Sequence, residues 1–349
     1  MSGRTPAQTE KWMTQRATRE PLVFAPGESR ALGRAVSERA GIELATLEER
    51  EYEGGEFKLR PLQPVRGRTV FVVQSLAGTQ EAPIAQRLVR LLFLLQGLRD
   101  AGADHVVAVI PYLAYARKDR RTKPRDPVYT RYVAQLIEAA GTDRVVALDV
   151  HNASSIDNAF RIPVDHLSAL PMMAAHFTQH LPTGRLAVAS PDIGGIKRAQ
   201  TFRELLERRT GKEVELVFVE KRREGGVVSG GTIVGNASGR AVIVLDDMCA
   251  SGSTLLRAAS ALRAAGSASV HATVTHTPVE AGLVALLAAE DIAQVVATDS
   301  VGGAPNINAA HREKMKLLSA GELLGCAIAR MVSGDSLAPL AEHWPPPTA

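Results

Sequence analysis

The stretch Val242-Ile-Val-Leu-Asp-Asp-Met-Cys-Ala-Ser-Gly-Ser-Thr254 is the most informative part of this sequence. Four apolar residues end in two adjacent carboxylates, and a loop of small residues leads into a helix expected to begin near Thr254. Small residues let backbone N–H groups close on an anion at a helix N-terminus, and the hydroxyls of Ser251, Ser253 and Thr254 add donors. The stretch therefore predicts a strand of a parallel sheet followed by a phosphate-binding loop, with two carboxylates beside it that can accept hydrogen bonds from the hydroxyls of a diol.

A plainer interpretation of the same residues exists. Asp246 and Asp247 would then only end a strand, and the hydroxyl residues would only cap the next helix. We favour the ligand site because a strand, an acid, a small loop and a helix follow one another in the order that ligand sites of parallel sheets use.

The pattern of this stretch recurs along the chain. Short β-branched runs are expected to be strands at 69–74, 105–111, 144–149, 185–190, 214–220, 241–246, 270–276 and 294–299. Apolar residues at three-to-four spacing predict helices at 82–101, 130–140, 195–208 and 253–265. Strand and helix alternate, which indicates an α/β protein whose mainly parallel sheets carry helices on both faces.

These units are too many for one open sheet, and residues 158–181 hold no strong strand. We therefore place a junction near residue 165 and expect two similar doubly wound domains, 21–165 and 166–335, with the site between them. Residues 1–20 form an N-terminal arm and 336–349 a Pro-rich tail, and residues 1–20 and 339–349 are expected to be mobile rather than packed.

Composition limits the class of protein. With 349 residues, 45% of them hydrophobic, the chain can bury a sizeable core, which excludes a disordered or fibrous protein. Lys and Arg number 41 against 37 Asp and Glu, a mild basic excess that suits a phosphorylated small molecule as well as a nucleic acid. Only two cysteines occur, and neither a signal peptide nor a membrane span is apparent, so we expect a cytoplasmic protein.

Seven further segments, with the first stretch, resemble the ribose-phosphate pyrophosphokinase family, the phosphoribosyl-diphosphate (PRPP) synthetases. In order they are 52–57, 65–75, 111–121, 148–151, 190–195, 220–223 and 298–300. The resemblance covers roughly residues 22 to 305 and implies two domains of the type I phosphoribosyltransferase fold. It also implies an Mg²⁺-dependent enzyme that transfers the diphosphoryl group of ATP to the C1 hydroxyl of ribose 5-phosphate, giving PRPP and AMP.

The resemblance assigns roles to particular residues. The nucleotide would contact Gly54, Gly55, Glu56, Arg117 and Lys118. Arg117 follows a strand, and its guanidinium suits phosphates, although Arg117 also belongs to a basic run that could simply be a solvated face.

Two residues at strand ends are implied to hold Mg²⁺. They are His151 and Asp192. Imidazole is not a ligand that Mg²⁺ prefers, so a structural histidine is the competing interpretation of His151.

Lys221 and Arg223 are implied to be catalytic, with Lys221 the principal cation acting on the transferring group. They precede a Gly-rich segment, 224–231, which reads either as a mobile lid or as a tight hairpin with exposed basic residues. The ribose phosphate would be bound by Arg223, Asp246, Asp247, Ala250, Ser251, Gly252, Ser253 and Thr254.

Three residues depart from the family pattern. Gly54 stands where the family usually has Asp in the base pocket, and Lys118 stands where it usually has Gln. Ala250 replaces an Asp that lies close to the ribose. The nucleotide preference is therefore open between ATP and another NTP, and Ala250 either lowers turnover or shifts the acceptor.

Competing functions follow from these departures. The main alternative is a non-catalytic regulatory subunit that binds ribose phosphates or nucleotides. A phosphoribosyltransferase that consumes PRPP would leave the N-terminal half unexplained, and the basic run lacks the interleaved aromatics of a nucleic-acid module. We expect no nucleic-acid or membrane partner; members of the family form homo-oligomers, based on dimers and often hexameric.

Overall fold

The computed structural model describes residues 19–79, 82–180, 184–224, 227–302 and 307–345. Between residues 221 and 231 the structure describes the backbone only. The described residues form two compact units. Unit 1 contains the residues up to Leu167 and a later segment, Gly321–Asp335, and unit 2 contains Ser168–Ala320 and the residues from Ser336 onward.

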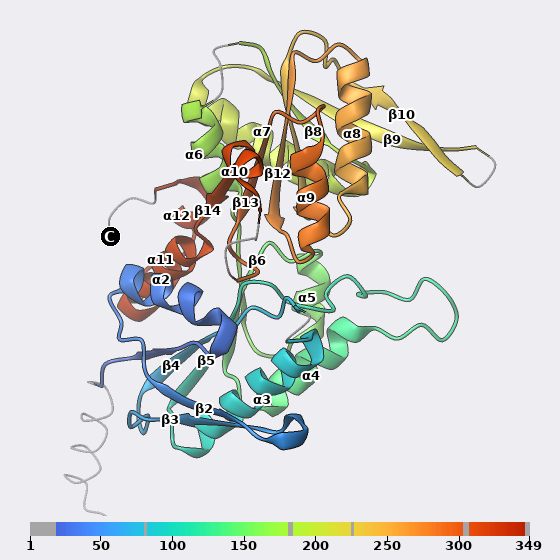
Figure 1. The fold of residues 1–349 in the computed structure, drawn as a ribbon. Coiled ribbons are helices and arrows are strands. Elements are labelled where there is room, and N and C mark those ends of the chain that lie inside the picture. Colours follow the sequence, from blue (N-terminus) through green and yellow to red (C-terminus); the bar gives the residue numbers. More distant parts are fainter. Residues whose placement is uncertain (1–18, 80–81, 181–183, 225–226, 303–306, 346–349) are drawn as a thin grey trace, which may run out of the picture. The chain divides into compact units, whose positions relative to one another are not determined.

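Unit 1 is built on a five-stranded parallel sheet (Figure 1). Its strand order is β1-β4-β5-β6-β7, with bounds Leu22–Phe24, Thr69–Val73, His105–Ile110, Arg144–Leu148 and Val164–Leu167. The central three strands were expected. The expectation of no strong strand in 158–181 was wrong, because β7 lies there; it is a four-residue edge strand in which two of the side chains are polar, so it lacks an apolar run.

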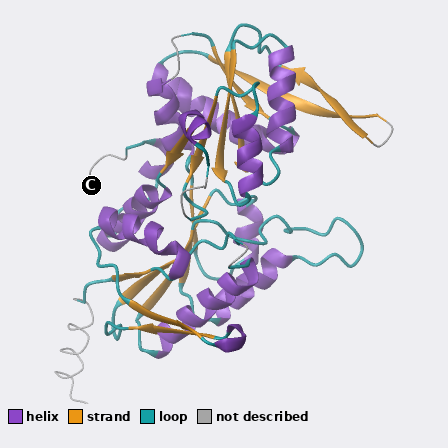
Figure 2. Ribbon diagram, viewed as in Figure 1, coloured by secondary structure: helices purple, strands orange, loops and turns teal. Residues whose placement is uncertain are grey.

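Helices and a small hairpin complete unit 1 (Figure 2). The helices are α2 (Arg30–Ala40), α3 (Ile84–Asp100), α4 (Tyr129–Ala139), α5 (Ala153–Ala159) and α11 (Ala320–Ser333), with a short 3₁₀ turn η1 (Gly27–Ser29) before α2. The antiparallel hairpin joins β2 (Leu47–Glu51) to β3 (Phe57–Pro61). Its strands are highly charged, so no apolar run indicated a strand there.

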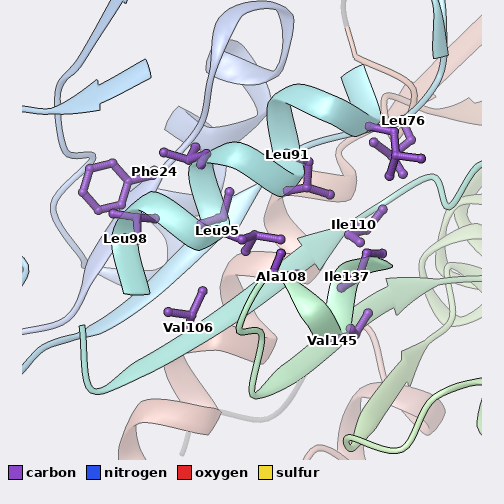
Figure 3. Close-up of a cluster of buried hydrophobic side chains, with 14 of the residues drawn as sticks. Phe24, Leu76, Leu91, Leu95, Leu98, Val106, Ala108, Ile110, Ile137 and Val145 are labelled. Atoms are coloured by element: carbon purple, nitrogen blue, oxygen red, sulfur yellow. The ribbon is translucent and has the colours of Figure 1, made fainter. Parts of the chain in front are cut away.

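The core of unit 1 lies between its sheet and the apolar faces of α3 and α4 (Figure 3). Leu91, Leu95 and Leu98 of α3 are buried over Val106 and Ala108 of β5. Alternate residues of the central strands, which face the other side of the sheet, are buried as well. Burial on both faces explains why these strands read as continuous apolar runs.

Helix α11 belongs to unit 1, although we expected residues 321–335 in the C-terminal domain. A Cβ on Gly325 would lie 2.5 Å from the Cβ of Arg39, so the backbone of α11 runs directly against α2. Arg39 also pairs with Glu322 at 3.3 Å. Sequence order alone did not reveal that the chain returns to its first unit.

Unit 2 is built on a seven-stranded sheet of order β10-β9-β8-β11-β12-β13-β14 (Figure 1). Its strands are β8 (Leu186–Ser190), β9 (Val214–Glu224), β10 (Val227–Val234), β11 (Ala241–Met248), β12 (Ser269–His276), β13 (Gln294–Thr298) and β14 (Met315–Leu318). All neighbouring pairs are parallel except β9 with β10. The expected mainly parallel α/β fold is confirmed in both units.

Two helix layers cover the sheet of unit 2. On one face the core is formed with α8 (Ser253–Ala264) and α9 (Glu280–Ala288). On the other, Phe177 of α6 (Leu170–His180) contacts Phe202 of α7 (Ile196–Thr210) and His271 of β12. A 3₁₀ turn η3 (Ile193–Gly195), α10 (Ala309–Lys314) and α12 (Pro339–Glu342) complete the unit.

The tail is partly packed. We expected residues 339–349 to be mobile, but α12 packs on α6 and buries Leu340. A single leucine among prolines was too weak a signal to indicate this. Residues 1–18 of the expected arm lie outside the described part of the chain.

Among the described helices, none combines the length and apolarity that a membrane crossing needs.

Candidate active site

The two carboxylates end β11 as expected, and the small loop leads from them into α8. Gly252 has φ 74°, a left-handed conformation that glycine adopts freely, and it is the residue before α8. The Oγ atoms of Ser251 and Ser253 are 2.9 Å apart. Helix α8 begins at Ser253, as expected, so the loop's hydroxyls lie at a helix N-terminus where an anion is favoured.

The loop is held from outside by α9. A Cβ on Gly252 would lie 2.9 Å from the carbonyl oxygen of Gly282, which is in the first turn of α9. The N–H of Cys249 donates to the carbonyl of His276 at the end of β12. The loop backbone is therefore fixed on two sides by neighbouring elements of the same unit.

Arg198 connects the acidic pair to α7. Its Nη1 lies 3.6 Å from Asp246 Oδ1 and 3.3 Å from Asp247 Oδ1. Burial, and after it a hydrogen bond with Asp247 and the charge of Asp247, raise the pKa of Asp246 to about 7, while Arg198 opposes these effects. The sequence analysis did not identify Arg198. The signal that could have revealed it is a basic residue in the first turn of a helix that follows Asp192 and two glycines.

Asp192 lies after β8, where it was expected. Its Oδ1 accepts hydrogen bonds from the N–H groups of Gly194 and Gly195 at 3.0 and 3.3 Å and so shapes η3. The side chain is half-buried rather than enclosed. A carboxylate at this place suits Mg²⁺, which commonly takes one or two protein carboxylates and completes its shell with water and substrate phosphates.

No group of three or more His, Cys, Asp or Glu side chains that could hold a metal occurs among the described residues. Mg²⁺ does not need such a cage, because substrate and water oxygens supply the other ligands. The donor set is therefore compatible with Mg²⁺ bound together with a phosphorylated substrate.

The basic run in unit 1 folds around Asp126. Its Oδ2 accepts from Lys118 Nζ at 2.6 Å, from the Thr122 hydroxyl at 2.7 Å, and from the N–H groups of Thr122 and Lys123, each at 3.0 Å. The hydrogen bond from Lys118 and those from Thr122 hold the pKa of Asp126 well below its usual range. Lys118 is thus engaged in ordering this loop, whereas Arg117 is exposed.

His151 belongs to a polar group at the start of α5. Asp119 accepts from Asn152 Nδ2 at 2.8 Å and from Ser155 Oγ at 3.1 Å. Burial opposes ionisation of Asp119, but these two hydrogen bonds, with help from nearby His151, keep its pKa below the usual value. A pocket of about 350 Å³ opens beside Asp119 and Ser155, and Arg121 and Arg131 also line it.

The remaining expected residues lie on the two hairpins. Gly54 and Gly55, with φ 84° and 88°, form the 3₁₀ turn η2 (Glu53–Gly55) between β2 and β3, and Glu56 follows; all three are exposed. Lys221 and Arg223 lie on β9, opposite Gly231 and Val228 of β10, with a register irregularity between those partners. The antiparallel pairing of β9 with β10 fits the hairpin interpretation, and the lid stays a prediction.

Comparisons with known proteins agree with this architecture. Residues 22–141 match the N-terminal domain of ribose phosphate pyrophosphokinase, and residues 220–341 match the phosphoribosyl synthetase-associated domain. The chain is 35% identical to a ribose-phosphate pyrophosphokinase of Agrobacterium fabrum over 91% of its own length and 99% of that protein. It is 37% identical to a protein of the same name from Maricaulis maris, over 88% of its own length and 96% of that protein.

Among solved structures, the phosphoribosylpyrophosphate synthetase of Mycobacterium smegmatis is similar over its whole length and over 90% of this chain. The TM-score is 0.78 and the sequence identity is 27%. Sequence, domain matches and fold therefore agree over both units, and the chain belongs to the ribose-phosphate pyrophosphokinase family.

Proposed function

We propose that this chain is a ribose-phosphate diphosphokinase that transfers the β,γ-diphosphoryl group of ATP, or of another NTP, to the C1 hydroxyl of ribose 5-phosphate. The products would be PRPP and AMP or the corresponding NMP. The observation that carries the proposal is the end of β11, where two carboxylates adjoin a small loop at a helix N-terminus. Such a site accepts a sugar diol and donates to its phosphate.

The ribose phosphate is assigned to unit 2. Asp246 and Asp247 accept the sugar hydroxyls, and the backbone from Ala250 to Thr254 donates to the 5-phosphate. Arg223 adds a cation on β9. The loop's fixed backbone supports this assignment, because a prearranged set of donors binds an anion without first having to be ordered.

The nucleotide is assigned to unit 1. Arg117 binds phosphates, and the turn formed by Gly54, Gly55 and Glu56 lies beside the base. Lys118 acts by ordering the loop through Asp126 rather than by contacting the base. Lys118, which stands where the family usually has Gln, would therefore stabilise this loop instead of binding the base.

Mg²⁺ is the proposed cofactor, held by Asp192 and His151 together with substrate oxygens. When bound, it would neutralise negative charge on the diphosphate. The chain's own contribution is to orient the C1 hydroxyl towards the β-phosphorus and to place Lys221 near the transferring group. Positioning and charge neutralisation supply most of the catalysis in phosphoryl transfer.

We further propose that the protein is cytoplasmic and acts as a homo-oligomer based on dimers. Both cysteines are buried free thiols, which suits a reducing compartment. Tyr129, Tyr132 and Leu136 form an exposed apolar stripe along α4, of the kind that subunit interfaces cover.

The test is a donor screen. Purified protein is incubated with ribose 5-phosphate, Mg²⁺ and ATP, GTP, CTP or ADP, and PRPP and the nucleotide product are quantified together. One NMP formed for each PRPP supports the proposal and identifies the donor. If no donor gives PRPP while ribose 5-phosphate still binds, the chain is instead the non-catalytic subunit that the departures at Gly54 and Ala250 suggest.

A further inference from the structure

Two neighbouring carboxylates at the end of β11 create an electrostatic problem inside unit 2. The side chain of Asp247 is only 7% exposed, and that of Asp246 is 23% exposed. Because the two carboxylates are close together and poorly hydrated, sharing one proton between them is favoured over ionising both. A protonated carboxyl donates a hydrogen bond where the proposed diol needs an acceptor.

Arg198 is the cation that offsets the repulsion between these two carboxylates. It reaches both carboxylates through the same atom, Nη1, and its own side chain is 21% exposed. It comes from the first turn of α7, so it is held by a helix rather than by a loop. A fixed, partly buried guanidinium favours the charged form of both neighbours.

The other groups around Asp246 do not supply this charge. Asp247 on the same strand is acidic, and the Cys249 thiol, whose pKa burial raises to about 11, is neutral. The residue opposite Asp246 on β12 is Val274. Arg198 is the only cation that the structure pairs with Asp246 among the described residues.

We propose that Arg198 is a positioning residue that keeps Asp246 and Asp247 side by side in their ionised form, ready to accept two sugar hydroxyls. The inference rests on the proposed function for the identity of the ligand, but the charge relationship itself does not. Arg198 need not contact the substrate. It sets the protonation state of the residues that do.

The first test measures binding of ribose 5-phosphate by calorimetry between pH 6 and 9. The wild-type affinity should fall as the pH drops through about 7, where Asp246 takes up a proton. In Arg198→Gln this fall should move upward by about one pH unit or more, because a lost opposite charge raises a carboxyl pKa by that order. Arg198→Lys should restore much of the profile.

Arg203→Gln is the matched control, because Arg203 lies on the same helix and pairs only loosely with Glu207, at 3.9 Å. It should leave the profile unchanged. Ionisation of the ligand's own phosphate is common to all variants and cancels in the comparison. A loss in Arg198→Gln by the same factor at every pH, without rescue by lysine, would overturn the inference.

The second test needs no ligand and separates this inference from the proposed function. Because the pKa of Asp246 is raised in the folded chain, its ionisation destabilises the fold progressively from the usual pKa near 4 up to about 7. Without Arg198 that loss should continue to higher pH. Thermal unfolding should therefore show a small difference between wild type and Arg198→Gln at pH 5.5 and a larger one at pH 8.5.

When Asp246→Asn is present in both proteins compared, the difference between Arg198 and Arg198→Gln should no longer depend on pH. If the difference is the same at both pH values, the inference fails even if ribose 5-phosphate binds. If the wild type binds no ribose 5-phosphate but the unfolding difference grows with pH, the proposed ligand is wrong and the role of Arg198 in the charge pair stands.

Discussion

A Cβ at position 282 would lie 2.0 Å from the carbonyl oxygen of Ala250, because Gly282 packs directly against the backbone of the loop that follows β11. No real Cβ sits that close to an oxygen, so any side chain here must push the loop or α9 aside. The shape of the proposed ribose-phosphate site therefore depends on a residue outside the recognised motif.

Gly282→Ala should damage the ribose-phosphate site more than the fold. Overpacking of this kind costs about 1–3 kcal/mol of stability. A loop displaced by about 1 Å can lower turnover by roughly 10²-fold. We expect a large rise in the KM for ribose 5-phosphate, with a smaller change in the KM for the nucleotide, measured by steady-state kinetics.

Gly97→Ala serves as the control for that substitution. Gly97 is also a helical glycine, in α3, but a Cβ there would meet nothing within 4 Å. It should be neutral or slightly stabilising, since alanine favours helix over glycine by about 1 kcal/mol. Unchanged kinetics in Gly282→Ala would show that the loop can shift without cost.

Lys221→Ala tests the proposed principal catalytic cation. If Lys221 stabilises charge on the transferring group only in the transition state, kcat should fall by about 10²–10³-fold. The affinity for ribose 5-phosphate should change little, because the Asp pair and the loop remain. Lys212→Ala, an exposed lysine shortly before β9, is the control. A wild-type rate in Lys221→Ala would remove Lys221 from the mechanism.

The sequence predicted the central sheets well because their strands are buried on both faces. Runs such as 105–111 and 241–246 are continuous and apolar, so they stand out from the charged segments around them. Strands β2 and β3 were not predicted because charged residues interrupt their few apolar ones, so neither strand shows an apolar run. Helix α11 was assigned to the wrong unit because packing between distant segments, here Gly325 on Arg39, leaves no local pattern.

From the sequence we could predict only those parts of the candidate site whose residues are adjacent in the chain. Asp246, Asp247 and the following loop are adjacent in sequence, and their strand-to-helix context is visible in the residue order. Arg198 and Gly282 lie 49 and 35 residues from Asp247 in the sequence. Arg198 meets Asp247, and Gly282 meets the loop that follows, only in the folded chain, so residue order cannot connect them. The supporting residues of a site are set by tertiary contact, which a single sequence does not display.

Asp126→Asn should loosen the loop that follows Arg117. The substitution removes the charge that pairs with Lys118 and replaces one acceptor oxygen by a donor group. We expect a higher KM for the nucleotide and faster hydrogen exchange at Thr122 and Lys123, with little effect on the KM for ribose 5-phosphate.

The pH dependence of that loop is predictable in sign. Because the folded pKa of Asp126 is depressed, its contribution to stability is present above the usual pKa near 4 and is lost only as the pH falls through the lower folded value. Loop order should therefore be constant across any neutral assay range. Asp100→Asn, at the exposed end of α3, is the control, and an unchanged nucleotide KM in Asp126→Asn would separate the loop from nucleotide binding.

Ala250→Asp tests whether the departure in the ribose-phosphate loop limits turnover. The backbone of Ala250 packs against Gly282, and the residue is only partly buried, so its side chain is not enclosed. We expect kcat to rise, because a third carboxylate would add negative charge that a bound cation can use at the reaction centre.

Ala250→Asn separates charge from size, since it is close in shape to aspartate but neutral. A gain with Asp and none with Asn would assign the limitation to the missing charge. A fall with Asp has the opposite meaning: Asp246 already has a pKa raised to about 7, and a further carboxylate would raise it more and leave the diol acceptor protonated. That result would show that the ionisation of Asp246 and Asp247, beside Arg198, depends on having an uncharged residue at position 250.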